Sequence, residues 1–262
     1  SHNRPVSMFT LDAVSYRLPE KTLLHPIDLT IEHGQIVGLI GHNGSGKSTL
    51  LKLLARQLKT SAGKTSLEGK DLHRWGDRPL ARQIAYLPQQ PPATDGLTAR
   101  ELVSFGRYPW HGALGRFSRE DREQVDRAMA LTDTERFADR GVDELSGGER
   151  QRVWLAMLLA QNARYLLLDE PTSALDVAHQ VEVLSLVRKL GKELEMGVVV
   201  VLHDINMAAS YCDHLVALHS GRLLTEGSPD QLMNQDTLKD IYGIPMSILA
   251  HPRQEGARIA VV

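Results

Sequence analysis

Apolar and polar positions along the chain predict short strands that alternate with helices. Residues 8–16 and 27–31 alternate partially, with turn residues between them, which indicates antiparallel strands. Residues 35–40 form an apolar run of the kind expected for a buried parallel strand. Further apolar runs, which we interpret as strands, lie at residues 84–87, 165–169, 198–203 and 215–218. Helical stretches such as residues 49–58 separate most of these runs, so we expect an α/β fold with a mostly parallel sheet.

Residues 90–145 interrupt this alternation. They contain no clear strand, and residues 98–106 and 118–131 have helical patterns. Ser118, with Asp121 three residues later, resembles the capping box that begins a helix. We therefore expect a helical subdomain inserted into the α/β fold. The predicted division is a core of residues 1–89 and 152–240, a helical subdomain of residues 90–151, and a tail of residues 241–262. A further helix is expected to begin at Ser228-Pro229, and the residues after His251 show little pattern.

Composition narrows the class of protein. The chain has 262 residues, 42% of them hydrophobic, which is enough for a sizeable core. Its 30 Lys and Arg residues nearly balance 32 Asp and Glu residues, so we expect no nucleic-acid partner. Apolar runs such as residues 198–202 are too short to span a bilayer. The single cysteine, Cys212, cannot form an internal disulfide, and the 11 histidines are scattered, which argues against a structural metal site.

A glycine-rich stretch joins the apolar run at residues 35–40 to the helix predicted after it. It reads Gly41-His42-Asn43-Gly44-Ser45-Gly46-Lys47-Ser48-Thr49 and fits the phosphate-loop pattern G-x-x-x-x-G-K-[ST]. The glycines let backbone N–H groups converge on phosphate oxygens, and the helix turns its positive end toward the same anion. We therefore predict that this stretch binds a nucleotide, that Lys47 contacts the β- and γ-phosphates, and that Ser48 ligates Mg²⁺.

A second candidate site lies where the apolar run 165–169 ends in Asp169, followed at once by Glu170. On their own, two carboxylates after a strand are more often an ordinary strand end. With a phosphate loop earlier in the chain, the expected role of Asp169 is to hold Mg²⁺, usually through water. Glu170 would then lie near the water that attacks the terminal phosphate.

With these residues in place, the chain resembles the ATP-binding-cassette (ABC) ATPases along nearly its whole length. Residues 145–151, Leu-Ser-Gly-Gly-Glu-Arg-Gln, look like the signature of that family. Gln89 is similar to the glutamine at the junction with the helical subdomain, Asp176 to the end of the D-loop, and His203 to the switch histidine. The resemblance implies a P-loop NTPase core with an antiparallel β subdomain and an inserted helical subdomain.

The resemblance also implies roles in ATP hydrolysis. Glu170 would be the general base for in-line attack of water on the γ-phosphorus. His203 would contact the γ-phosphate and hold the water in place, and Gln89 would contact Mg²⁺ and water. Tyr16 is expected to stack on adenine, although simple packing of an aromatic side chain near a strand end stays open.

The signature is predicted to form a second anion site. Ser146 can cap the helix that follows, so that Gly147 and Gly148 expose N–H groups at its positive end, with Glu149 beside them. The resemblance implies that two copies of the chain dimerise head to tail and that each signature closes over the ATP of its partner. The sequence of a single chain does not require this arrangement.

A chain with one cassette and no membrane span needs partners. The resemblance implies an ATP-hydrolysing importer subunit on the cytoplasmic face of the bacterial inner membrane. It implies a membrane permease as direct partner and an external substrate-binding protein as indirect partner. Residues 106–117, 202–209 and 241–246 are similar to the ATPases of ferric hydroxamate siderophore importers, which belong with the iron-chelate and vitamin B12 importers. Nothing in the chain physically encodes the cargo.

Several alternatives stay open. Residues 107–117, read as a loop rich in aromatics and arginines, either dock the permease or place Trp110 and Phe117 in the core of the helical subdomain. The importer could carry another iron chelate or vitamin B12. A non-transport cassette protein of DNA repair or of the ribosome is disfavoured, because the chain lacks a heptad insertion and a second cassette. The signature argues against a P-loop kinase, and the missing Asn-Lys-x-Asp motif argues against a GTPase.

Overall fold

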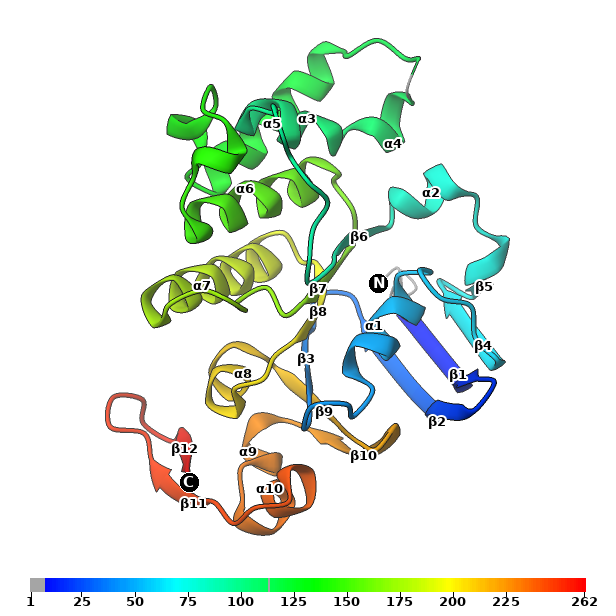
Figure 1. The fold of residues 1–262 in the computed structure, drawn as a ribbon, viewed down its shortest axis with the longest axis vertical. Helices are drawn as coiled ribbons and strands as arrows, with labels where there is room; N and C mark the ends of the chain where they lie inside the picture. The colour runs from blue at the N-terminus through cyan, green and yellow to red at the C-terminus, as the bar shows by residue number, and fades with distance from the viewer. Residues whose placement is uncertain (1–7, 113) are drawn as a thin grey trace, which may run out of the picture. The chain divides into compact units, whose positions relative to one another are not determined.

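The computed structural model describes residues 8–112 and 114–262 (Figure 1). The chain forms two compact units. The first unit comprises the residues up to Arg74 together with Gly197–Val262, and the second comprises Trp75–Met196. The division predicted from the sequence, with boundaries at residues 89, 151 and 240, stays a prediction.

Parallel strands form the centre of the first unit. Strand β3 (Ile36–Ile40) pairs in parallel with β8 (Gly197–Val201) on one side and with β9 (His214–His219) on the other. Every residue of β3 and β8 is buried, which explains why both read as continuous apolar runs. Strand β10 (Arg222–Gly227) joins β9 antiparallel. Together with the parallel pair in the second unit, these strands confirm the predicted α/β fold with mostly parallel strands.

A separate antiparallel sheet belongs to the same unit. Its strands lie in the order β2 (Lys21–Glu32), β1 (Met8–Leu18), β4 (Ala62–Leu67) and β5 (Lys70–Asp71). The antiparallel pairing of β1 with β2 confirms the prediction for residues 8–16 and 27–31, and both strands extend further than predicted.

The helices of the first unit are short: α1 (Lys47–Leu54), α8 (Ile205–Tyr211), α9 (Pro229–Leu232) and α10 (Gln235–Tyr242). A 3-10 turn covers Leu72–Arg74. The predicted start at Ser228-Pro229 is confirmed, because the Ser228 side chain caps α9. Helix α1 starts at Lys47, as expected for the helix that follows the phosphate loop, but the predicted end at residue 58 is wrong. The chain leaves the helix after Leu54, and Arg56 has a φ of 55°, which a helix does not tolerate.

A C-terminal hairpin was not predicted from the sequence. Strands β11 (Ser247–Ala250) and β12 (Arg258–Val261) pair antiparallel. The Asn206 side chain on α8 donates to the Ala260 carbonyl (2.9 Å) and accepts from the Ala260 N–H (2.8 Å). These two bonds attach β12 to the helix that follows His203.

The second unit contains two strands and a group of helices. Strand β6 (Ile84–Leu87) pairs in parallel with β7 (Tyr165–Asp169), after α2 (Asp77–Ala81). Helices α3 (Ala99–Phe105), α5 (Arg119–Leu131) and α6 (Gly147–Ala160) pack against one another (Figure 1). The remaining elements are α4 (Tyr108–His111), α7 (Val177–Glu193) and 3-10 turns at Glu135–Phe137 and Val142–Glu144. Capping boxes at Thr98 and Ser118 begin α3 and α5, which confirms both predicted helices.

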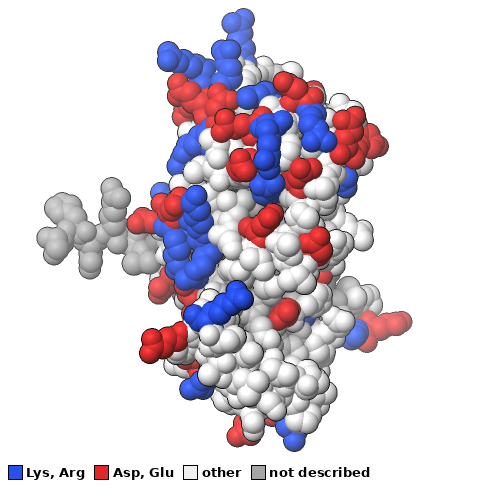
Figure 2. Space-filling view, turned by 90° about the vertical axis from the view of Figure 1, so that its left-hand side faces the viewer, with Lys and Arg blue, Asp and Glu red and all other residues white. Residues whose placement is uncertain are grey.

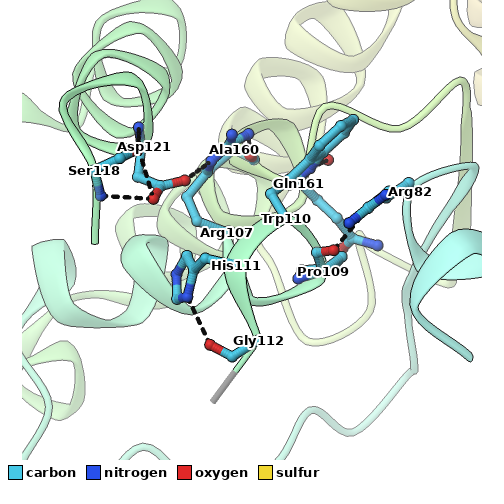
Figure 3. A network of polar contacts seen from close by, with 10 residues as sticks. All are labelled: Arg82, Arg107, Pro109, Trp110, His111, Gly112, Ser118, Asp121, Ala160 and Gln161. Carbon is cyan, nitrogen blue, oxygen red and sulfur yellow. Dashed lines mark hydrogen bonds and ion pairs between the residues drawn. The ribbon is translucent and has the colours of Figure 1, made fainter. Parts of the chain in front are cut away.

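The segment between α3 and α5 is held by a buried ion pair. Arg107 Nε donates to Asp121 Oδ1 (2.9 Å), and both side chains are 3% exposed (Figure 3). The same carboxylate accepts from the Ser118 N–H, so it caps α5 and neutralises Arg107 at once. The prediction of a loop at residues 107–117 is wrong in part, because α4 forms there.

Aromatic side chains of this segment are exposed. Trp110 is 37% exposed, donates from its indole N–H to the Gln161 carbonyl (2.7 Å), and has the Arg82 and Arg107 guanidinium groups over its ring (Figure 3). Phe117 is 39% exposed. Both side chains are therefore partly covered and partly exposed, and neither is fully buried in the helical core.

The surface agrees with the balanced composition. Basic and acidic side chains are interspersed on the face shown in Figure 2, over the part of the chain that the structure describes. No helix among residues 8–112 and 114–262 is long and apolar enough to cross a membrane.

Candidate functional site

The predicted phosphate loop spans the turn between β3 and α1. Gly46 is the N-cap residue of α1 and has a φ of 106°, a conformation that favours glycine. No side chain caps α1, so the amides at its start are suited to phosphate oxygens. The other predicted ligands of the loop differ in burial. Gly41 and Ser45 are buried, His42, Ser48 and Thr49 are half-buried, and Asn43 and Gly44 are exposed.

Lys47 lies inside the loop. Its side chain is buried, and its ammonium group donates to the carbonyl oxygens of Gly41 (2.5 Å) and His42 (3.1 Å). These bonds hold a positive charge at the centre of the turn, where a nucleotide phosphate would lie.

The turn between β9 and β10 supports the same loop. The Gly221 N–H donates to the Ser45 carbonyl (2.9 Å), and the rings of His219 and His42 meet edge to face with centroids 4.7 Å apart. The phosphate loop is thus backed by a second segment of its own unit.

In the second unit, β7 delivers Asp169 and Glu170. All five residues of β7 are buried, and Asp169 and Glu170 are 3% and 9% exposed. Burial, with the negative charge of Asp169 as a smaller cause, raises the pKa of Tyr86 on β6 to about 12. Asp169 therefore brings a negative charge into a mostly buried setting.

Gln89 and Glu170 are brought together although they are far apart in the sequence. Gln89 Nε2 donates to Glu170 Oε2 over 2.6 Å. Glu170 has a φ of 49°, which is unusual for a residue with a side chain and turns the chain sharply after the strand. The Gln89 amide thus contacts the predicted general base itself.

The signature forms the start of α6. The Ser146 hydroxyl accepts from the Glu149 N–H (3.3 Å), and the Glu149 carboxylate accepts from the Ser146 N–H (3.0 Å). The predicted cap by Ser146 is therefore present and forms a complete capping box. Since the box uses the amide of Glu149, it leaves the amides of Gly147 and Gly148 out of the cap. The backbone bond from Ser146 is the main reason that the pKa of Glu149 is lowered.

The remaining predicted residues lie as follows. Asp176 caps α7 by accepting from the His179 N–H (2.9 Å). His203 is exposed, two residues beyond the end of β8. Tyr16 is half-buried on β1, opposite Leu24 of β2. Stacking of Tyr16 on adenine stays a prediction.

One residue beside the predicted site belongs to none of the motifs. His179 Nδ1 lies 2.8 Å from Asp176 Oδ1, and its ring packs against the start of α6 at Gly148. Its only signal in the sequence is the spacing of three residues from an acidic helix cap.

Comparison with known proteins identifies the family. The family model for ABC transporters matches residues 24–173 of the chain. The chain belongs to the ABC transporter family. The matched residues include the phosphate loop, the whole signature and the acidic end of β7.

Two relatives support this membership over almost the whole chain. The achromobactin transport ATP-binding protein of Dickeya dadantii is 44% identical over 88% of this chain and 86% of its own length. The iron(3+)-hydroxamate import ATP-binding protein of Bacillus subtilis is 42% identical over 89% of this chain and 87% of its own length. As a cassette protein of this kind, the chain is an ATPase.

A solved structure gives the same fold. The post-hydrolysis dimer of the ATP-binding cassette MJ0796, bound to ADP and phosphate, is 31% identical to this chain. It has a TM-score of 0.72 and covers 84% of this chain and 98% of its own. The family therefore binds ATP, and this chain has the family's fold.

Proposed function

We propose that this cassette hydrolyses ATP to power a bacterial importer of ferric siderophores, and that the siderophore is an iron(III)-hydroxamate. The observation that carries the proposal is the 42% identity with an iron(3+)-hydroxamate import ATP-binding protein over 89% of the chain. The achromobactin transport relative, 44% identical, supports the wider class of siderophores.

For the reaction, each residue has a chemical task. Residues 41–49 hold the ATP phosphates, with Lys47 supplying a buried positive charge. Glu170 accepts a proton from the attacking water, and Gln89 fixes the carboxylate of Glu170 in place. His203 contacts the γ-phosphate, Asp176 belongs to the D-loop, and Tyr16 stacks on adenine.

The donors available for Mg²⁺ fit that ion. Ser48 offers a hydroxyl oxygen, Asp169 a carboxylate and Gln89 an amide oxygen, and Mg²⁺ prefers such oxygen ligands. Because Gln89 Nε2 already donates to Glu170, its amide oxygen is the atom suited to a cation. When bound, Mg²⁺ supplies positive charge that neutralises the β- and γ-phosphates.

A second copy of the chain completes the site. The capped start of α6 presents Gly147 and Gly148 beside Ser146 and Glu149, as an anion site suited to the γ-phosphate of a partner's ATP. The dimeric structure of the related cassette MJ0796 supports a dimer, and the head-to-tail arrangement is part of the proposal.

The importer's membrane permease would be the second partner. Phe105, Tyr108 and Trp110 are 59%, 48% and 37% exposed, and such apolar side chains are favoured at protein interfaces. Such a contact would hold the cassette at the cytoplasmic face of the inner membrane. A substrate-binding protein would act on the permease from the other side and would not touch this chain.

The test of the reaction is Glu170→Gln. The variant should keep ATP affinity within about threefold and lose hydrolysis by about 100-fold or more, because the base is missing. Glu182→Gln, an exposed glutamate on α7, is the matched control. Hydrolysis by Glu170→Gln at the wild-type rate would remove Glu170 from the role of base.

The test of the cargo uses the complex of this chain with its permease and binding protein in liposomes. Ferric hydroxamates should stimulate ATP hydrolysis more than other ferric siderophores or vitamin B12. Stimulation by vitamin B12 alone would reassign the importer, and stimulation by none of them would contradict the class.

A further inference from the structure

We propose that His179 is a positioning residue that joins the D-loop to the signature within one chain. The proposal rests on the proposed ATPase function and adds a residue outside the family's motifs. All the residues involved lie in the second unit.

The first contact is with Asp176. One oxygen of this carboxylate, Oδ1, accepts from both the backbone N–H of His179 (2.9 Å) and the ring at Nδ1 (2.8 Å). The backbone bond from His179 is the main reason that the pKa of Asp176 is lowered, so the carboxylate is ionised near neutral pH. An ionised carboxylate only accepts, and the ring nitrogen therefore carries the proton. The ring is held in one orientation as a result.

The second contact is with the signature. A Cβ atom placed on Gly148 would lie only 2.4 Å from Cδ2 of the His179 ring and 2.8 Å from its Cγ. Such distances are not possible between real atoms, so the ring occupies the space that the missing side chain leaves. The imidazole therefore packs directly on the backbone at the start of α6.

Two further contacts join the same stretches. Gln151 Nε2 donates to the Pro171 carbonyl (2.8 Å), and Leu175 Cδ2 lies 3.3 Å from the Cβ position of Gly147. Because the His179 ring contacts both the Asp176 side chain and Gly148, it can transmit a displacement of the D-loop to the amides of the signature. The consequence is that closure of a partner's ATP site depends on a side chain that touches no nucleotide.

The substitution His179→Ala isolates the ring. Alanine keeps the backbone N–H that Asp176 accepts, so α7 stays capped. We expect ATP binding by the monomer to change by less than about twofold and kcat to fall by about tenfold, with KM within about threefold. His179→Asn, whose amide replaces the ring donor toward Asp176, should recover at least about half of kcat. His33→Ala, at an exposed turn, is the control.

A thermal-unfolding cycle tests the contact without any activity. Gly148→Ala should lower Tm in the wild-type background and lower it much less beside His179→Ala, because the clash is gone. Equal losses in the two backgrounds would overturn the contact. A His179→Ala enzyme with wild-type kcat, or one that loses monomer ATP binding and is not rescued by asparagine, would overturn the positioning role. If the wild type itself hydrolyses no ATP, the proposed function fails, while the unfolding cycle still reports on the contact.

Discussion

The starts of α1 and α6 are both glycine-rich and both lie at the positive end of a helix dipole. They differ in capping, because a side chain caps α6 and none caps α1. At α1, Gly46 offers no side chain to cap the helix, and Lys47 crosses the turn to bond two loop carbonyls. At α6, Ser146 and Glu149 form a complete capping box. The first end therefore gains its partners from a ligand, whereas the second is ordered before any ligand arrives.

This difference indicates a division of labour. An uncapped helix end holds a phosphate strongly because binding satisfies amides that the protein leaves to the ligand. A capped end is already stable, and in the proposed dimer it would close as a rigid surface over an anion bound by the partner subunit. Substitutions at the two ends should thus have different effects on binding and on hydrolysis.

The largest effect is expected at the phosphate loop. Lys47→Ala should weaken ATP binding by about 100-fold, or about 2.7 kcal/mol, because a buried charge opposite the phosphates is lost. Calorimetric titration of the purified chain measures this affinity. Lys52→Ala, an exposed lysine on the same helix, should bind ATP normally. If Lys47→Ala and wild type bind ATP with equal affinity, the start of α1 is not the phosphate-binding helix end and does not differ from the start of α6 in this respect.

A smaller effect on stability is expected at the signature. Ser146→Ala should lower the free energy of unfolding by about 1 kcal/mol, because the cap of α6 is lost. It should leave ATP binding by the monomer intact and reduce hydrolysis. Ser118→Ala removes the equivalent cap of α5 and is the matched control. Denaturant unfolding measures the loss of stability of each variant, and steady-state assays measure its loss of ATP hydrolysis. If Ser118→Ala impairs hydrolysis as much as Ser146→Ala, the signature has no special role.

The smallest effect concerns the pH dependence of the signature cap. The pKa of Glu149 is lowered from 4.5 in the folded chain, so its carboxylate stabilises the fold above that value. This contribution is lost as the pH falls through the lower, folded pKa. Glu149→Gln should therefore cost a few tenths of a kcal/mol near pH 7, since the group is largely exposed, and nothing in strong acid. Denaturant unfolding near pH 7 and in strong acid checks this, with Glu144→Gln as the control variant. If the difference in free energy of unfolding between wild type and Glu149→Gln is the same at both pH values, the capping role of the carboxylate is contradicted.

The local features of the site could be predicted from the sequence. The caps at Ser118, Ser146 and Ser228 join a side chain to a backbone group three residues away, so their geometry is set within one helical turn. The buried strands β3 and β7 read directly as apolar runs. The phosphate loop could also be predicted, because its glycine-rich motif is local and directly follows the apolar run of β3.

The contacts between distant residues could not be predicted in this way. Gln89 meets Glu170 from 81 positions away, and the Arg107 partner Asp121 already had a local role as a helix cap. Strand β10 alternates exposed residues with half-buried or buried ones, but its two leucines, Leu223 and Leu224, are adjacent in the sequence, so the alternation cannot be read from the apolar positions. His179 shows the same limit, since its ring packs on Gly148 of the signature, 31 positions earlier in the chain.

The pair of bonds between Asn206 and Ala260 has a consequence for how the chain behaves in a crowded solution. A two-stranded hairpin presents open edges, and open edges recruit strands from other molecules. Here a helix side chain donates to and accepts from one residue of β12, as a neighbouring strand would. The amide of Asn206 thereby occupies the edge groups of Ala260, which are then not available to pair with a strand of another molecule.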